Sequence, residues 1–126
     1  DWILQKTAEV CKNLGRQNDI LARIGGEEFC ILLSSCNIQA AIQRAEACRK
    51  AIAEINTAES GFDFTITASF GVTDAKTSGY ELEKLLADAD SAAYDSKHAG
   101  RNEVTIFKHE TNEKKMVKLD DTLNAF

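Results

Sequence analysis

Two adjacent carboxylates follow two adjacent glycines in the segment Gly25-Gly26-Glu27-Glu28. Neighbouring carboxylates repel each other, and glycine loses much conformational entropy on folding, so folding alone gives little reason for this segment. A chemical reason is that glycine lets a ligand approach the backbone while a carboxylate holds a hard divalent cation. An ordinary solvated turn is the alternative, and the residue types alone leave both open.

Two further pairs of charged residues are candidates for binding anions. Lys97 and Arg101 lie near the expected end of a helix, where arginine binds phosphate through its planar fork and lysine as a point charge. The alternative is that these cations simply complement the helix dipole. Arg16 and Asp19 stand three residues apart, and taken by themselves they are compatible with ordinary surface charge.

Composition excludes several classes of protein. The chain has 126 residues, and 15 Lys and Arg against 20 Asp and Glu give a net charge of -5. This length indicates one domain, and the mild acidity argues against a general nucleic-acid binder. No apolar run approaches the roughly 18 residues of a membrane span, and no secretory signal opens the chain. The four cysteines form no CxxC motif, which favours free buried thiols in a reducing cytoplasm over a disulfide or metal set.

Three stretches place apolar residues at three- and four-residue steps, which predicts amphipathic helices. The first runs from the start of the chain to about Gly15, and the last is closed by Gly100. The predicted apolar stripes are Ile3, Leu4, Ala8, Cys11 and Leu14; Ala41, Ala45, Cys48, Ile52 and Ile55; and Leu82, Leu85, Leu86, Ala89 and Ala93.

Four segments are typical of strands. Residues 19–24 and 29–33 flank the Gly25-Gly26 turn, which predicts a β-hairpin. The second of these is continuously apolar, which predicts that both of its faces are covered. Residues 62–72 alternate in polarity and indicate a long strand, and residues 103–107 indicate a short one.

The order of these elements is helix, strand, strand, helix, strand, helix, strand. One strand added in front makes β-α-β-β-α-β, the ferredoxin-like α+β arrangement with helices on one face of a sheet. The opening with a ready-made helix therefore suggests a truncated domain that lacks its first strand.

The chemistry-bearing segments together resemble the GGDEF family of diguanylate cyclases, in register along residues 1–107. The resemblance implies the α+β fold of nucleotidyl cyclases for residues 1–107, with residues 108–126 as a C-terminal tail or linker. The motifs that carry it are Arg16-x-x-Asp19, Arg23-x-Gly25-Gly26-Glu27-Glu28-Phe29, Thr67-x-Ser69-x-Gly71, Ala89-Asp90 and Tyr94-x-x-Lys97-x-x-Gly100-Arg101-Asn102.

By this resemblance, the domain condenses two GTP into cyclic di-GMP and releases two pyrophosphates. Each of two domains in a homodimer holds one GTP, and Mg²⁺ or Mn²⁺ is the cofactor. The resemblance implies a cytoplasmic protein, or the cytosolic side of a membrane-anchored parent.

The resemblance also assigns roles to residues. Glu27 becomes the metal-binding carboxylate and proposed general base, and Glu28 a supporting metal ligand. Gly25 and Gly26 let the nucleotide lie close to the hairpin. The remaining substrate residues are Lys97 and Arg101, which hold the terminal phosphates, and Asp1, which reads the guanine edge.

Arg16 and Asp19 match the inhibitory product site of the family, the RxxD motif. Many relatives complete that site with an arginine on the following helix. Gln43 and Ala47 stand at the expected positions here, while Arg44 is displaced, which predicts weakened product inhibition.

Two departures from the family pattern bear on activity. Glu27 stands where aspartate is commoner, and active relatives also carry glutamate there. The metal-binding aspartate of the family's first strand does not precede Asp1, so we expect this chain to bind metal poorly and to be an inactive fragment. Besides the cyclase, a non-catalytic cyclic di-GMP-binding module and a fragment that dimerises through an exposed sheet edge stay open.

Overall fold

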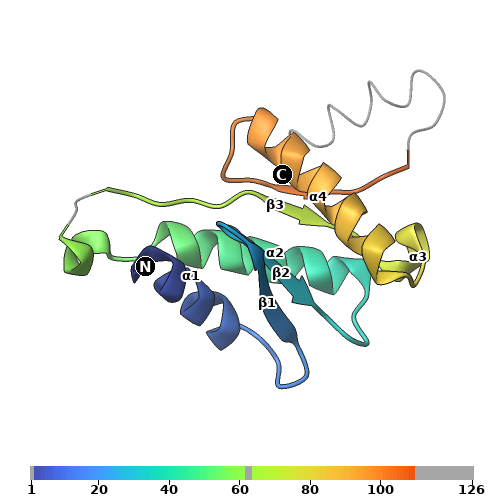
Figure 1. Cartoon of the computed structure of the whole chain (residues 1–126), viewed down its shortest axis with the longest axis horizontal. Helices are drawn as coiled ribbons and strands as arrows, with labels where there is room; N and C mark the ends of the chain where they lie inside the picture. Colours follow the sequence, from blue (N-terminus) through green and yellow to red (C-terminus); the bar gives the residue numbers. More distant parts are fainter. Residues whose placement is uncertain (1, 62–63, 110–126) are drawn as a thin grey trace. The chain divides into compact units, whose positions relative to one another are not determined.

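The computed structural model describes residues 2–61 and 64–109 (Figure 1). The described chain divides into two compact units, residues 1–68 and 69–126, and each is taken by itself below. The helices and strands are α1 (Trp2–Asn13), β1 (Ile20–Gly25), β2 (Glu28–Leu32), α2 (Ile38–Ala53), the 3-10 turn η1 (Thr57–Ser60), β3 (Phe70–Val72), α3 (Ala75–Ser78), α4 (Leu82–His98) and β4 (Val104–Ile106).

The first two helices of the first unit confirm the predicted helical stripes. α1 packs against α2, and the buried residues of the two helices are Cys11, Ala45, Cys48 and Ile52. The Asn37 side chain caps α2 by accepting a 2.8 Å hydrogen bond from the backbone amide of Ala40. Leu14 and Ile55, the last residues of the two predicted stripes, lie beyond the ends of α1 and α2, and Leu14 is exposed.

β1 and β2 form the predicted antiparallel hairpin, with Ile20 opposite Leu32. The prediction that both faces of the second strand are covered is wrong, because Phe29–Leu32 are half-buried. Among the described residues β2 pairs with β1 alone, and a two-stranded sheet leaves part of each strand open to solvent.

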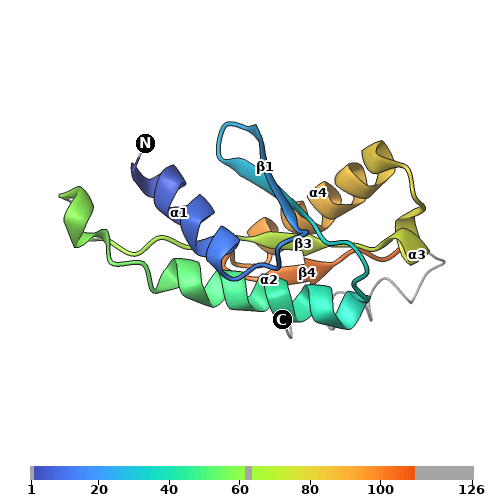
Figure 2. The same ribbon diagram turned by 90° about the horizontal axis from the view of Figure 1, so that it is seen from below.

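The second unit is built from a β-α-β arrangement. β3 and β4 pair in parallel, with Phe70 opposite Val104, and α4 packs across both strands (Figure 2). Gly71 makes this close packing possible. A Cβ atom there would overlap the carbonyl oxygen of Ala89 and the amide nitrogen of Ala93 in the α4 backbone.

The predicted long strand at residues 62–72 is wrong in its length. Residues 64–69 lie outside any strand, and β3 begins at Phe70. The reason is the partner strand: β4 spans three residues, so the parallel ladder ends after three pairs. Residues 62–63 are outside the described part of the chain.

The apolar stripe predicted for α4 is only partly buried in the structure. Leu82 is exposed, and the other four predicted residues are half-buried. The fully buried residues of α4 are Asp88, Ala92 and Ser96. Asp88 is accommodated on this face because Lys84 donates a 2.7 Å hydrogen bond to its carboxylate.

The short elements η1 and α3 lie outside the predictions. Asn56 and Asp74 cap them through their side chains. The predicted tail or linker at 108–126 falls, beyond His109, outside the described residues. Within residues 2–61 and 64–109 there is no helix long and apolar enough to cross a membrane.

Candidate nucleotide site

The tip of the β1–β2 hairpin presents Glu27 and Glu28 to solvent. Among the described residues, none of the ion pairs involves either glutamate. Gly26 adopts a left-handed φ of 45°, and a Cβ at Gly25 or Gly26 would meet no atom within 4 Å. The glycines therefore leave open space beside two unpaired carboxylates, as a bound ligand requires.

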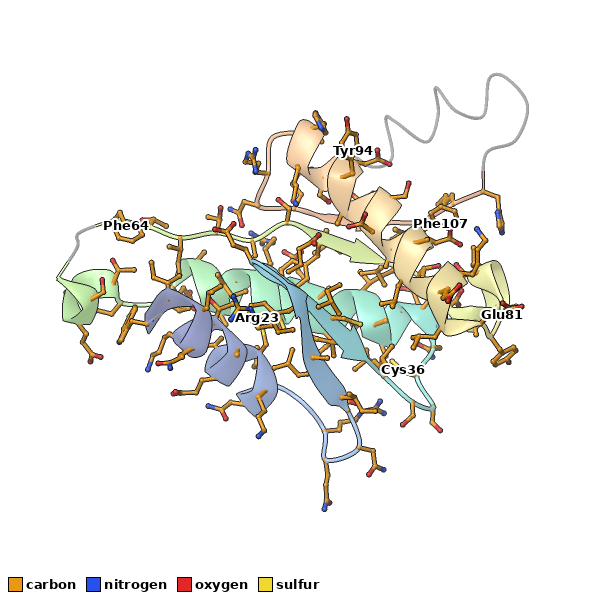
Figure 3. The ribbon with its side chains drawn as sticks, viewed as in Figure 1. Arg23, Cys36, Phe64, Glu81, Tyr94 and Phe107 are labelled. Carbon is orange, nitrogen blue, oxygen red and sulfur yellow. The ribbon has the colours of Figure 1, made fainter. Side chains whose placement is uncertain are left out.

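Arg23 holds the shape of this tip from β1 (Figure 3). Its Nε donates a 2.8 Å hydrogen bond to the carbonyl oxygen of Gly26. The pairing register also shifts between Arg23 and Gly25, which leaves one extra residue on β1. Such a bulge bends a strand and redirects its side chains, and bulges are enriched next to active sites.

The carboxylates of Glu27 and Glu28 suit a hard divalent cation. Mg²⁺ is commonly held by one or two carboxylates, with water and substrate phosphates as its other ligands. The described residues gather no group of three or more His, Cys, Asp or Glu that could hold a metal. A cation at this hairpin would therefore take its other ligands from water and from the phosphates of a nucleotide.

Lys97 and Arg101 lie at the C-terminal end of α4, in the second unit. Both are exposed, and in the described part of the chain neither forms an ion pair. The Arg101 backbone amide donates a 3.0 Å hydrogen bond to Ser96, and Arg101 and Asn102 both adopt left-handed φ values, 64° and 52°. Non-glycine residues rarely adopt this conformation, and clustered left-handed residues are typical of functional sites.

Two buried hydroxyl groups fix the end of α4 against its sheet. Ser96 Oγ donates a 2.9 Å hydrogen bond to the Phe70 carbonyl and lies 2.5 Å from Thr105 Oγ1. Because Phe70 is on β3 and Thr105 on β4, this serine anchors the last turn of α4 to both strands. Because Lys97 is the next residue in the sequence, this anchor also fixes the position of the Lys97 backbone.

The RxxD turn between α1 and β1 is a compact hydrogen-bonded cluster. Asp19 accepts bonds from the Arg16 backbone amide at 2.8 Å, from Arg16 Nε at 3.2 Å and from Arg16 Nη2 at 3.1 Å. Arg16 Nη2 also donates to the Ser34 carbonyl at 2.7 Å. The structure thus brings the two predicted residues of this motif together.

Arg44 also belongs to this cluster, although it is displaced from the positions where relatives carry the completing arginine. Its Nη1 lies 2.5 Å from Asp19 Oδ2. Its Nη2 donates a 3.2 Å bond to the Cys11 carbonyl. The signal was present in the spacing, because Arg44 is four residues before the buried Cys48 and so shares its face of α2.

The charges around Asp19 stabilise its ionised form. The backbone amide of Arg16, followed by the Arg44 side chain, lowers the pKa of Asp19 to about 2. The Asp19 side chain is only 6% exposed, and the Arg44 side chain 14%. This carboxylate therefore stays charged at any physiological pH.

All four cysteines are free thiols. Cys11 and Cys48 are buried next to Arg44, as predicted, whereas Cys30 and Cys36 are only half-buried. The hydrogen bond from the Cys11 thiol, with a further contribution from Arg44, lowers the pKa of Cys48 to about 7. The same pairing raises the pKa of Cys11.

The structure places the predicted site residues in both units. Gly25, Gly26, Glu27 and Glu28 belong to the first unit and Lys97 and Arg101 to the second, and each group is described within its own unit. Asp1, the predicted guanine reader, lies outside the described residues.

Comparisons with known proteins agree with the motifs. Residues 1–103 match the family model described as diguanylate cyclase, GGDEF domain. The chain is 35% identical over 109 residues to diguanylate cyclase A of Treponema denticola, covering 86% of this chain and 29% of that protein. It is 32% identical over 108 residues to the probable diguanylate cyclase DgcE of Escherichia coli, covering 86% of this chain and 10% of that protein. The chain thus spans less than a third of these curated relatives.

Solved structures show the same fold. The active GGEEF domain of a diguanylate cyclase from Vibrio cholerae superposes with a TM-score of 0.79 at 26% identity, covering 87% of this chain and 69% of that one. The GGDEF domain of DgcB from Caulobacter crescentus, solved in complex with c-di-GMP, has a TM-score of 0.71 at 26% identity, covering 83% and 63%. The α+β fold of nucleotidyl cyclases, predicted from the sequence, is confirmed, and the chain belongs to the GGDEF domain family of diguanylate cyclases.

Proposed function

We propose that this domain condenses two GTP molecules into cyclic di-GMP and releases two pyrophosphates. In each half of the reaction the 3′-oxygen of one GTP bonds to the α-phosphorus of the other, and pyrophosphate leaves. The observation that carries the proposal is the hairpin tip, where Glu27 and Glu28 are exposed and unpaired beside two glycines with open space above them.

The reaction requires that the attacking hydroxyl lose its proton and that the phosphate charge be balanced. Glu27 accepts the proton of the 3′-hydroxyl, and Glu28 is a supporting metal ligand at the same hairpin tip. Mg²⁺ or Mn²⁺, when bound by these carboxylates, balances phosphate charge and lowers the pKa of the hydroxyl. Gly25 and Gly26 let the nucleotide lie against the hairpin backbone.

The terminal phosphates are assigned to Lys97 and Arg101. Both side chains are exposed cations, Lys97 in the last turn of α4 and Arg101 on the turn that follows, whose backbone amide bonds to the Ser96 carbonyl. The planar guanidinium of Arg101 suits bidentate binding of phosphate oxygens, and Lys97 adds a point charge. We assign Asp1 to the guanine edge, because a carboxylate accepts hydrogen bonds from the N1 and N2 groups of guanine.

Catalysis by this proposal takes place in a homodimer, with one GTP on each domain. The bond that forms joins two nucleotides, so two sites must face each other. We place the protein in the cytoplasm, where GTP is available and where the four free thiols stay reduced.

The test is chromatographic detection of cyclic di-GMP after the full-length protein is incubated with GTP and Mg²⁺. The proposal predicts cyclic di-GMP and pyrophosphate in a ratio of one to two. GTP left unchanged by a folded, dimeric protein would contradict it. The same incubation of residues 1–126 alone tests the expectation that this fragment is inactive.

A second candidate function is recognition of cyclic di-GMP without catalysis, favoured by the Arg16–Asp19 cluster. Arg16 provides a guanidinium for phosphate or guanine, and Asp19 an ionised carboxylate. As part of an active cyclase, the same cluster would be the site of product inhibition. Calorimetric titration with cyclic di-GMP tests the site, since Arg16→Ala must weaken binding, and an unchanged affinity would remove Arg16 from it.

A further inference from the structure

The carboxylate of Asp19 has no free hydrogen-bonding position. A carboxylate offers about four acceptor positions. Three are filled by Arg16, through its backbone amide, Nε and Nη2, and the fourth is filled by Arg44 Nη1 at 2.5 Å. With its side chain only 6% exposed, Asp19 is closed to a ligand that needs an acceptor.

Arg44 closes this carboxylate from the interior of the first unit. Its side chain comes from α2 and is only 14% exposed. Besides Asp19 it contacts the Cys11 carbonyl through Nη2, while its Nε is buried without a hydrogen-bond partner. Arg44 is therefore held by Asp19 and by α1, in a position that leaves little of its guanidinium for a ligand in solvent.

Arg16 and Arg44 differ in how much of each side chain a ligand in solvent can reach. The Arg16 side chain is 52% exposed, so it can turn toward a phosphate or a guanine ring once its bonds to Asp19 loosen. The N1–H and N2–H donors of a guanine edge bind a carboxylate with one donor on each oxygen. Arg16 can vacate Oδ1, but both positions on Oδ2 are held by the Arg16 backbone amide and by Arg44 Nη1, so the second guanine donor competes with Arg44.

We propose that Arg44 is an internal competitor of cyclic di-GMP at the Arg16–Asp19 site. The ligand must displace the Arg44 guanidinium from Asp19 before its guanine edge can bind there. This inference rests on the assignment of Arg16 and Asp19 to the product site under the proposed function. Its consequence is a product site of lowered affinity, so that synthesis stops only at a higher concentration of cyclic di-GMP.

Substitution of Arg44 distinguishes two possible roles of this residue: competition with the ligand for Asp19, and electrostatic attraction of the ligand. If Arg44 served the site only as a positive charge, its loss would weaken binding of the dianionic ligand. If it competes, Arg44→Gln frees one position on Asp19 and strengthens binding. Displacing a charge-assisted hydrogen bond is worth about tenfold or more in affinity. The inference therefore predicts a Kd for cyclic di-GMP at least about tenfold lower in Arg44→Gln than in the wild type.

The experiment is calorimetric titration of cyclic di-GMP into five proteins: the wild type, Arg44→Gln, Arg44→Lys, Lys50→Gln and Arg16→Ala. Lys50 is an exposed cation on the same helix, so its variant controls for the loss of one positive charge. Arg44→Lys keeps a cation beside Asp19, and its affinity should fall between those of the wild type and Arg44→Gln. Circular dichroism checks that each variant is folded, and Arg44→Met carries the same prediction if the Gln variant is not.

An affinity in Arg44→Gln equal to or weaker than that of the wild type overturns the inference, as does absence of binding to both proteins. A gain shared by Lys50→Gln also overturns it. Arg16→Ala identifies a different failure. If its affinity matches that of the wild type, the ligand binds elsewhere and the assignment of the product site is wrong. Loss of binding in Arg16→Ala, together with a gain in affinity in Arg44→Gln, supports both the product-site assignment and the competition by Arg44.

Discussion

Gly71 gives the sharpest test of how the second unit is packed. It lies in the middle of β3, directly against α4. In Gly71→Ala the new methyl group would overlap the carbonyl oxygen of Ala89 and the amide nitrogen of Ala93, and it would lie 3.0 Å from the carbonyl carbon of Ala92. All three are backbone atoms of a helix, so no side chain can rotate away. Helix α4 must move from β3, or the strand must bend.

The size of the effect follows from this geometry. Overpacking of a tight interface commonly costs 1–3 kcal/mol, and rigid backbone on the opposing side places Gly71→Ala at about 3 kcal/mol. A chain of 126 residues has an unfolding entropy of roughly 2.1 cal/mol/K per residue, which converts this loss into a fall in Tm of about 10 °C. Displacement of α4 also moves Lys97, so KM for GTP should rise in an active protein.

The assay is thermal unfolding followed by circular dichroism, with Gly61→Ala as the matched control. A Cβ at Gly61 meets open space, and its φ of 88° and ψ of 3° lie in the left-handed region, so that substitution costs only about 1 kcal/mol of backbone strain. Gly71→Ala should therefore lower Tm about three times as much as the control. A variant as stable as the wild type, or one stabilised by the roughly 0.4–1 kcal/mol that alanine gains through the unfolded state, would refute the packing argument.

Two further predictions concern the first unit. Because the folded pKa of Asp19 is about 2, below its ordinary 3.8, its ionised form contributes stability that is present above about pH 4 and lost as the pH falls toward 2. Asp19→Asn should therefore flatten this part of a curve of Tm against pH. A curve unchanged by the substitution would contradict the assignment. Cys30 and Cys36 should react with iodoacetamide before Cys11, which is buried and whose pKa is raised. Peptide mass spectrometry after brief labelling gives the order, and early labelling of Cys11 would argue against its burial.

Local sequence patterns predicted the helices and the hairpin of the first unit because their causes are local. The three- and four-residue spacing of Ala45, Cys48 and Ile52 determines which face of α2 is buried, and Cys11 is the buried residue of α1. The Gly25-Gly26 pair likewise provides the left-handed turn without help from distant residues.

The second unit was predicted less well because tertiary contacts determine the length of β3 and the buried face of α4. The length of β3 is limited by its three-residue partner β4, which the alternation of residues 62–72 does not reveal. The buried face of α4 is decided by the approach of Gly71 and by the bonds of Ser96 to both strands. As a result Ala92 and Ser96 are fully buried, while Leu85 and Leu86, which hydrophobicity favours, are half-buried.

In the candidate site, sequence reasoning paired Arg16 with Asp19 but missed the part played by Arg44. By the spacing of the family, the completing arginine is expected at Gln43 or Ala47. In the structure, Arg44 of α2 instead contacts Asp19 and the Cys11 carbonyl of α1. A long arginine side chain reaches several ångströms from its backbone, so its contact depends on how two helices pack and not on local spacing alone.

The central claim is that the hairpin carboxylate of Glu27 drives a metal-dependent condensation of GTP. The most direct measurement compares initial rates of cyclic di-GMP formation by full-length wild type and Glu27→Gln at saturating GTP and Mg²⁺. Since Glu27 is exposed and unpaired in the described structure, the variant should fold normally. Loss of a general base commonly lowers a rate by about 10²–10⁴-fold, and the account predicts a fall of at least about a hundredfold. A Glu27→Gln protein that makes cyclic di-GMP at the wild-type rate would contradict it.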